Sequence, residues 1–560
     1  MSDSTAEADA GFTAADAAEI AREHADAFDA LAAALHGDGA SPAAGAPGNA
    51  NGLGGNDGAD DSDDANDAAD WRPEVDAALV RPGDDAYDDA RLVWNGLVER
   101  YPAAVAYAAD AADVARIVET ARETGLGVAL RSGGHSVAGA STCDGGVVLD
   151  CSRMDAVTVD PDAGTAVVEP GATLRDVDEA TQAHGLATPL GVAPDTGVTG
   201  LTLGGGTGYL TRGYGLACDR LTRVDVVTAA GERVTASADR NPDLFRALRG
   251  GGGNFGAAVE LEFDLVELDH DVAMCDTWYR FGDADHAAAL LRRYRELTRD
   301  ADRETNVSPY VAVVPESADG DGGRSGDRGG DSVADGAAAS DDAASATADA
   351  SFPDDAAGDL ALCFLGAYAG DPERGEAELR PYRELDDDAL LADRAERLPY
   401  LELQRLLGGD SPQGDRYYWK SIAVDDLTDD LVELTVDRMR RMPGDRDTVV
   451  VWPLGGAVAD FDPDETAIPG RDADFVLNFE AAWEDPADDA EQRRWAKRSV
   501  ELVRDRAGGD DGELPNFAGD EAGAAAARAV FGENYEWLRD AKTEWDPENV
   551  FGPSGRLDPR

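Results

Sequence analysis

Three glycine-rich segments constrain the fold of this chain more than any other feature of its sequence. They are Arg131-Ser132-Gly133-Gly134-His135, the run from Gly204 to Gly208, and the run from Arg249 to Gly256. Glycine lets a backbone approach a ligand closely, because no Cβ stands in the way. Rows of backbone N–H groups in such loops can bind a polyphosphate. We therefore expect the three loops to converge on one ligand, with His135 inside the first loop.

The third segment contains the pattern Gly251-x-Gly253-x-x-Gly256, which also occurs in the dinucleotide-binding fingerprint of doubly wound folds. That fingerprint must open a helix. Here Ala257 to Phe263 has the pattern of a strand instead. We therefore interpret the glycine runs as loops that cradle a cofactor, with tight turns alone as the alternative.

The regular structure expected around these loops mixes helices with short strands. Asp110 caps a helix that runs to Gly125, with Val114, Ile117 and Val118 on its apolar face. A second helix starts near Leu174 and is closed by Gly185. The expected strands are 127–130, 147–149, 166–168, 224–227, 259–263, 449–452 and 475–479. This mixture predicts an α+β fold.

Composition adds a strong charge constraint. The formal net charge is −65 in 560 residues, and Lys420, Lys497 and Lys542 are the only lysines among 49 basic residues. Such a chain repels itself unless salt screens it, so we predict adaptation to a salt-rich cytosol and loss of fold or cofactor in dilute buffer. A nucleic-acid partner is disfavoured, because phosphate binding needs basic patches.

Cysteines and targeting signals give the expected compartment. The five cysteines form no CxxC pair and no metal-ligand spacing, which suits a reducing cytosol and predicts no metal site. The N-terminus lacks the features of a signal peptide, and no apolar stretch is long enough to span a membrane. We expect a cytoplasmic protein with neither a membrane nor a nucleic-acid partner.

Composition shifts divide the chain into four parts. Residues 1–70 are expected to be an acidic, mostly disordered tail, with a possible amphipathic helix over 15–35. Residues 71–265 hold the glycine loops, and 266–510 form a second domain in which 316–357 is a disordered acidic insertion. Residues 511–560 are expected to return to the first domain.

Several motifs together resemble the FAD-linked oxidases that have a vanillyl-alcohol-oxidase-type (PCMH) FAD-binding domain, and most of all the berberine-bridge-enzyme-like group. Besides the His135 loop, the resemblance rests on Asp243 to Gly256, Tyr417-Tyr418-Trp419-Lys420-Ser421, Gly532 to Tyr535, and Asp546 to Phe551. It implies a two-subdomain PCMH-type FAD domain, an α+β substrate domain with an antiparallel sheet, and a C-terminal segment that folds back onto the flavin.

The resemblance also implies the cofactor and how it is held. FAD is expected to be bonded to His135 through the 8α-methyl group of the flavin. The other residues implied in FAD binding are Arg131, Ser132, Gly133, Gly134, Ser136, Pro194, Gly197, Gly200, Gly204, Gly205, Gly206, Gly208, Tyr209, Gly253, Asn254, Gly256, Asn549 and Phe551.

Two positions depart from the pattern of the group. Many relatives form a second flavin bond from a cysteine in a Gly-x-Cys-Pro context, where this chain has Ala193. We therefore expect a single covalent link. Relatives often place a catalytic tyrosine in Tyr-x-Asn, where this chain has Leu514-Pro515-Asn516.

The catalytic base must then come from another residue. On the expected strand 475–480, Asn478 and Glu480 share one face because side chains alternate along a strand. Glu480 is our candidate base if it is partly desolvated, and the competing interpretation is an ordinary carboxylate on an edge strand. Tyr417 and Tyr418 are alternatives, of which only one can face a pocket. Trp419 and Trp452 are expected to pack rather than to function.

The resemblance implies hydride transfer from an alcohol group of a sugar or secondary metabolite to flavin N5, with electrons passed to O₂ to give H₂O₂. A dehydrogenase that excludes O₂ is the alternative enzyme. A non-catalytic flavin-binding protein is a third hypothesis, motivated by the changes at Ala193 and Leu514.

Overall fold

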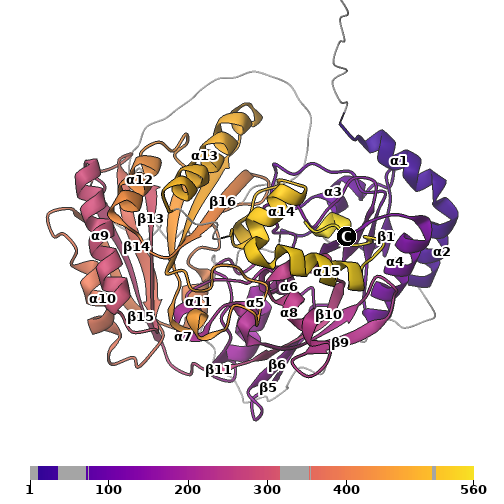
Figure 1. Ribbon diagram of the computed structural model, residues 1–560, viewed down its shortest axis with the longest axis horizontal. Coiled ribbons are helices and arrows are strands. Elements are labelled where there is room, and N and C mark those ends of the chain that lie inside the picture. The colour runs from indigo at the N-terminus through magenta and orange to yellow at the C-terminus, as the bar shows by residue number, and fades with distance from the viewer. Residues whose placement is uncertain (1–10, 36–70, 74, 316–351, 354, 508–511) are drawn as a thin grey trace, which may run out of the picture.

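The structure is a computed structural model that describes residues 11–35, 71–73, 75–315, 352–353, 355–507 and 512–560. Figure 1 shows a large twisted sheet with its covering helices on one side, and a second group of smaller sheets and helices on the other. Both groups mix helices with sheets, as the α+β prediction requires.

The first small sheet carries the histidine loop. Its strand order is β1 (Leu79–Val80), β2 (Ala104–Tyr107), β4 (Val147–Asp150), β3 (Val128–Arg131). Strands β2, β4 and β3 are parallel. Helix α4 (Ala111–Thr124) connects β2 to β3, begins at the cap Asp110 and ends at Gly125, as the sequence predicted. The loop that follows β3 contains His135.

The second small sheet is antiparallel and carries the third glycine loop. Its order is β5 (Val157–Asp160), β6 (Thr165–Val168), β10 (Ala257–Asp264), β8 (Leu221–Val227), β9 (Arg233–Ser237). Because β10 starts at Ala257, the Gly251–Gly256 loop leads into a strand and not into a helix. This confirms that the Gly251-x-Gly253-x-x-Gly256 pattern is not the dinucleotide-binding fingerprint of a doubly wound fold.

The large sheet has seven antiparallel strands in the described part of the chain. Their order is β15 (Leu390–Leu398), β12 (Val272–Arg280), β14 (Leu360–Tyr368), β13 (Thr305–Val313), β17 (Thr448–Pro453), β18 (Phe475–Trp483), β16 (Arg416–Val424). This confirms the predicted antiparallel sheet.

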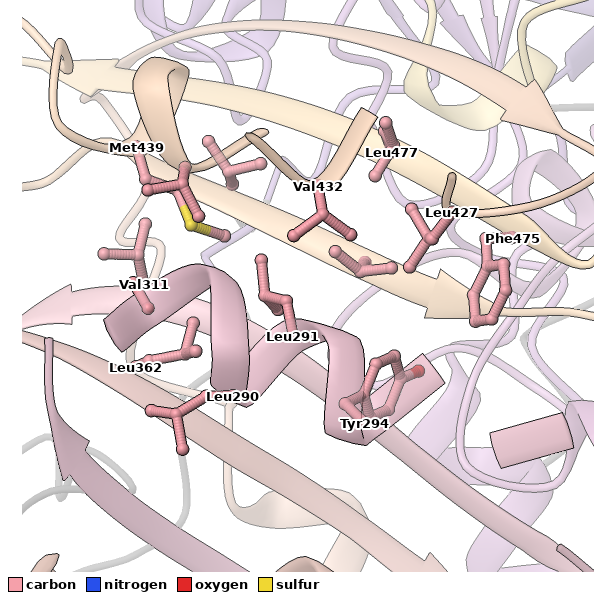
Figure 2. Close-up of a cluster of buried hydrophobic side chains, with 14 of the residues drawn as sticks. Leu290, Leu291, Tyr294, Val311, Leu362, Leu427, Val432, Met439, Phe475 and Leu477 are labelled. Carbon is pink, nitrogen blue, oxygen red and sulfur yellow. The ribbon is translucent and has the colours of Figure 1, made fainter. Parts of the chain in front are cut away.

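Helices cover one face of this sheet and leave the other for the cavity. They are α9 (Ala284–Asp300), α10 (Gly375–Arg383), α12 (Asp429–Met439) and α13 (Asp489–Ala507). Figure 2 shows the resulting core, in which Leu291 of α9 and Val432 of α12 lie over Leu477 of β18. Alternate residues of the same strands therefore point away from these helices.

The N-terminal residues that the structure describes form two helices where the sequence suggested one amphipathic helix over 15–35. They form α1 (Ala14–Glu23) and α2 (Ala25–Leu35), separated at His24. Phe28 and Leu31 are buried in the core beneath α4. Apolar burial against α4 thus outweighs the acidic composition of this stretch, while 36–70 lies outside the described residues.

The predicted insertion 316–357 lies mostly outside the described residues. At its end, Phe352 packs on Trp278 with ring centroids 4.9 Å apart, and Ala356 is buried. These two residues belong to the core of the large sheet.

The C-terminal residues pack on the part of the chain that carries the glycine loops. Phe531 of α14 (Ala524–Phe531) and Leu538 of α15 (Tyr535–Trp545) share a core with Leu248 of α8 (Pro242–Gly251). Figure 1 shows α14 and α15 beside α8 and away from α9 and α10. The remaining elements are α3 (Tyr87–Arg91), α5 (Leu174–Gln182), β7 (Leu186–Ala187), α6 (Val198–Leu203), α7 (Thr211–Tyr214), β11 (Val266–Glu267) and α11 (Tyr400–Arg405).

Candidate functional site

A cavity of about 860 Å³ lies between the glycine loops and the open face of the seven-stranded sheet. All three glycine segments reach it, so residues more than a hundred positions apart in the sequence share one site. The predicted residues that line it are Arg131, Ser132, Gly133, Gly134, His135, Ser136, Gly197, Gly200, Gly204, Gly208, Tyr209, Gly253, Asn254, Tyr417 and Glu480.

Seven other predicted site residues do not line this cavity, namely Pro194, Gly205, Gly206, Gly256, Tyr418, Asn549 and Phe551. Packing explains their positions. Gly205 and Gly206 face Ile468 and Ala217 behind their loop. Phe551 is fully buried in the core under β3, because Asp546 accepts its backbone N–H.

His135 is held in place by three neighbours. Its Nε2 lies 3.1 Å from Asp195 Oδ2, and the indole N–H of Trp71 donates to the same nitrogen at 3.2 Å. Trp94 stacks on the imidazole with centroids 5.2 Å apart. Burial acts to raise the pKa of Asp195, but the hydrogen bond and electrostatic attraction of His135, together with a backbone hydrogen bond and the charge of Arg175, outweigh burial and lower that pKa. Sequence reasoning did not identify Asp195, which comes from a separate loop sixty residues away.

The hydrogen bonds of the His135 ring within the described residues all involve Nε2. This contact set fixes the ring orientation and leaves Nδ1 as the ring nitrogen available to a ligand. His135 itself lines the cavity. The arrangement can therefore present one imidazole nitrogen to a bound group while an acidic partner holds the other.

Arg131 has a structural part in the same loop. Its guanidinium is buried, pairs with Asp150 at 2.5 Å, and donates to the carbonyl oxygens of Leu92 and Ala90. These bonds fasten the start of the histidine loop to β4. Arg131 thus shapes the site while its charge is already paired.

Asn516 holds the second glycine loop. Its Oδ1 accepts the N–H of Gly206 at 3.0 Å, and its Nδ2 donates to the carbonyl of Leu201 at 3.1 Å. A Cβ at Gly204 would lie 2.5 Å from Asn516 Nδ2, so this close approach requires glycine. In the sequence, Asn516 stood out only as the last residue of Leu514-Pro515-Asn516, which lacks the tyrosine of the family motif. Its contact with a loop some 310 residues away could not be predicted from the sequence.

Some residues that line the cavity carry unpaired polar atoms. Six buried side-chain atoms of lining residues make no hydrogen bond with any described residue. Buried polar groups normally have partners, so these six atoms are exceptions within the described part of the chain. They are Ser132 Oγ, Ser141 Oγ, Tyr209 Oη, Asn306 Oδ1, Trp419 Nε1 and Trp452 Nε1.

Glu480 lies on the sheet wall of the cavity, on β18 between β17 and β16. It is therefore not on an edge strand. Burial raises the pKa of Glu480 to about 8, while a hydrogen bond from Asn478 at 2.6 Å opposes that rise. No ion pair joins Glu480 to another residue in the described part of the chain. Its carboxyl group can accordingly exchange a proton near neutral pH.

The two adjacent tyrosines face opposite sides of β16, as the alternation predicts. Tyr417 lines the cavity and stacks on Trp94 with centroids 4.0 Å apart, and its hydroxyl donates to the Pro412 carbonyl. Tyr418 belongs to the helix-covered core and donates to Glu521. Burial raises the pKa of both hydroxyls well above the usual value, so neither gives up its proton easily.

Trp419 and Trp452 pack on neighbouring rings, and they also line the cavity. Both line the cavity with an unpaired indole N–H, and Trp419 lies directly across from Glu480 in the sheet. Phe517 stacks on Trp452 at 5.9 Å and lies 6.1 Å from Trp419. The three rings form an aromatic wall beside the Glu480 carboxyl group.

The two departures from the family pattern also have places in the structure. Ala193 lines the cavity, so a cysteine at this position would face the same space. All five cysteines are buried and free. Leu514 is buried in a small apolar core and contributes no polar group.

Two further features bear on a membrane and on metal ions as partners. No helix in the described residues combines the length and apolarity needed to cross a membrane. Within the same residues, no cluster of three or more His, Cys, Asp or Glu side chains is arranged to bind a metal ion.

Family comparisons agree with this geometry. Residues 102–237 match the family described as "FAD binding domain", and residues 511–553 match "Berberine and berberine like". An uncharacterised FAD-linked oxidoreductase of Bacillus subtilis is 27% identical over 486 residues, which is 84% of this chain and 95% of that protein. (R)-6-hydroxynicotine oxidase of Paenarthrobacter nicotinovorans is 38% identical over 194 residues, covering 35% of this chain and 42% of the relative.

The solved structure of glucooligosaccharide oxidase from Acremonium strictum, described as having a 6-S-cysteinyl, 8α-N1-histidyl FAD, has the same fold. It superposes with a TM-score of 0.70 at 22% identity, covering 86% of this chain and 96% of that one. The two matched families occupy the segments that surround the cavity, and the relatives matched along the chain are FAD-linked enzymes. The chain is therefore an FAD-linked oxidoreductase that carries an FAD-binding domain of the first family and a C-terminal segment of the berberine-like family.

Proposed function

We propose that this protein is an oxidase that binds FAD in the cavity through one covalent bond at His135 and oxidises an alcohol group of a sugar or secondary metabolite. The observation that carries the proposal is the meeting of three glycine loops, a held imidazole and an unpaired carboxyl group on one cavity.

The histidine loop supports the covalent bond at His135. Asp195 and Trp71 occupy Nε2, so Nδ1 is the nitrogen we assign to the flavin 8α position. The histidyl FAD of the glucooligosaccharide oxidase offers a parallel. The same enzyme's cysteinyl bond has no counterpart among our assignments, because Ala193 has no sulfur.

Glu480 is the residue that we propose as general base. A base must lie within hydrogen-bond reach of the hydroxyl proton, directly or through one water. Glu480 projects into the cavity from the sheet, beside the indole of Trp419. Its raised pKa lets it take a proton from a bound hydroxyl and release it to solvent near neutral pH.

Bound FAD supplies the redox chemistry, namely acceptance of a hydride at N5 and reoxidation by O₂ with formation of H₂O₂. Trp419, Trp452 and Phe517 orient the substrate by contact with its apolar faces. We further propose that the enzyme works in a salt-rich cytosol, which its net charge of −65 requires.

The deciding experiment is acid precipitation of protein purified in molar KCl, followed by visible spectroscopy of pellet and supernatant. We expect yellow colour in the pellet of the wild type and its release to the supernatant in His135→Ala. His184→Ala serves as a control, because His184 lies outside the cavity lining. Flavin that leaves the wild-type pellet would refute the covalent bond, and a colourless protein would favour the non-catalytic hypothesis.

Oxygen use is tested separately on the yellow protein. A panel of mono- and oligosaccharides and simple aromatic alcohols is supplied with O₂ or with a redox dye, and H₂O₂ is measured by a coupled peroxidase. Production of H₂O₂ supports the oxidase. Turnover with the dye but not with O₂ would replace it with the dehydrogenase.

A further inference from the structure

The C-terminal segment between α13 and α14 connects the two walls of the cavity. Residues 512–514 run along β16, which is the free edge of the large sheet: Ala423 donates to the Gly512 carbonyl, and Leu514 donates to Ser421 Oγ at 3.1 Å. Directly afterwards, Asn516 reaches the Gly200–Gly206 loop on the opposite wall. We call residues 513–521 the clasp.

A buried ammonium group fastens both ends of the clasp. Lys420 of β16 places Nζ 2.6 Å from Glu513 Oε2 and 3.3 Å from Glu521 Oε2. The side chains of Lys420 and Glu513 are 11% and 2% exposed. Charges this well shielded from solvent interact much more strongly than surface pairs. Removal of the ammonium would leave two carboxylates close together without their shared counter-ion.

Other contacts hold the second end of the clasp. Lys497 of α13 binds the other oxygen of Glu521 at 2.9 Å, and Tyr418 donates to the same residue. The pKa of Glu521 falls to about 2: burial acts to raise it, but the Lys420 charge and the hydrogen bonds from Lys497 and Tyr418 outweigh that effect. Glu521 is thus ionised at any pH at which the protein would work.

The use of lysine here is informative, because this chain uses arginine almost everywhere else. Of 49 basic residues only three are lysines, and two of them bind Glu521. The third, Lys542, is fully buried, pairs with Asp546 and donates to the Asn254 carbonyl of the third glycine loop. A compact ammonium with three donors suits such small polar pockets better than a planar guanidinium. All three lysines therefore fasten the C-terminal part of the chain.

We propose that the clasp couples the substrate-side sheet to the glycine loop that receives the flavin, and that Lys420 is the positioning residue that holds it closed. Lys420 lies on the face of β16 opposite to Trp419, so it acts through the clasp and not by touching a ligand. Asn516 transmits the position to Gly206 and Leu201, and Phe517 transmits it to Trp452 on the aromatic wall. The coupling rests on the proposed placement of FAD in the cavity.

The test compares Lys420→Met with Lys420→Arg and with Lys497→Met in the flavin-loaded, full-length protein in molar KCl. The Lys497 side chain is 42% exposed, and it pairs with Glu521 but not with Glu513. Loss of its charge is therefore the matched control. Hydrogen exchange is followed by mass spectrometry in the peptides that cover 513–521 and 200–206. In Lys420→Met we expect exchange in both peptides to become about tenfold faster or more, because local opening loses its main restraint.

Lys420→Arg keeps the positive charge but not the compact ammonium, so it should restore part of the protection, whereas Lys497→Met should change the protection by less than about threefold. The visible flavin band should lose fine structure in Lys420→Met and regain it in Lys420→Arg. Unchanged exchange in both peptides, or a change confined to 513–521, would overturn the coupling. Faster exchange in 200–206 with an unchanged flavin band would instead show that the clasp exists but that the flavin lies elsewhere.

A second variant keeps the test valid if Lys420→Met does not fold. Asn516→Ala removes only the hydrogen bonds to the loop and leaves the ion pairs of the clasp in place. We expect faster exchange at 200–206 with little change at Glu513 and Glu521. Equal protection of 200–206 in this variant and in the wild type would refute the proposal.

Discussion

At the scale of single residues, the chemistry of the site depends on how burial changes two acidic groups in opposite ways. Asp195 has His135 as a partner, and its pKa falls despite burial. Glu480 has only the amide of Asn478, so burial raises its pKa to about 8. Two carboxyl groups on one cavity thus differ in protonation at neutral pH, and the less acidic one is suited to proton transfer.

This difference predicts the pH dependence of the reaction. The ionised form of Glu480 is the base, so kcat/KM should rise with pH and level off above an apparent pKa of about 8. Glu480→Gln should reduce kcat by about a hundredfold or more and remove that rise. The measurement is a pH–rate profile in molar KCl with any accepted substrate.

Glu501→Gln makes the same charge change on an exposed part of α13 and should leave the profile intact. A Glu480→Gln enzyme that keeps both its rate and its pH profile would show that another group takes the proton.

At the scale of elements, side chains alternate along the strands of the large sheet, so that one face lines the cavity and the other packs against the helices. Odd-numbered residues of β16 such as Tyr417 and Trp419 face the cavity, while Tyr418 and Ile422 face the helices. The same rule places Glu480 on the cavity side of β18 and Leu477 and Phe479 in the core. The sequence pattern predicted this division once the strands were identified, because the period of a strand is two.

The N-terminal helices lie where the sequence suggested a possible amphipathic helix, and their packing leads to a prediction. Phe28 is fully buried against the core under α4. Phe28→Ala should therefore lower the free energy of unfolding by about 3–5 kcal/mol, as large-to-small changes in a core do. Denaturant unfolding in molar KCl measures this loss.

Phe12→Ala, at a side chain that is 38% exposed, is the comparison and should cost less than about 1 kcal/mol. A Phe28→Ala loss as small as that of Phe12→Ala would mean that α1 and α2 do not contribute to the stable core.

At the scale of the whole molecule, charge and fold act against each other. The two walls of the cavity come from different sheets, and the clasp joins them, because Lys420 holds it at Glu513 and its Asn516 binds Gly206. A net charge of −65 repels these parts from one another. Salt reduces this repulsion, since the screening length falls from about 10 Å at 0.1 M to about 3 Å at 1 M.

We accordingly predict that lowering KCl from 2 M to 0.05 M will lower the thermal unfolding temperature by about 10 °C or more and will weaken flavin absorbance before the fold is lost. Circular dichroism and visible spectra in one salt series measure both. A potassium-to-sodium exchange at constant ionic strength is the control for a specific ion effect. An unfolding temperature that does not depend on salt would contradict the role given to screening.

The family resemblance, the glycine loops and the alternation of β16 and β18 could be predicted from the sequence, and so could His135 as the candidate for a flavin bond. These are local signals: loop glycines, caps such as Asp110 and strand periods act over a few residues. Tertiary structure alone decided the contacts between distant segments. Three features depend on which loops and strands become neighbours. They are the contact of Asp195 with His135, the hydrogen bond of Asn516 with Gly206, and the interior position of β18. So does the pKa of Glu480, because desolvation is a property of the closed cavity and not of the residue or its neighbours in sequence.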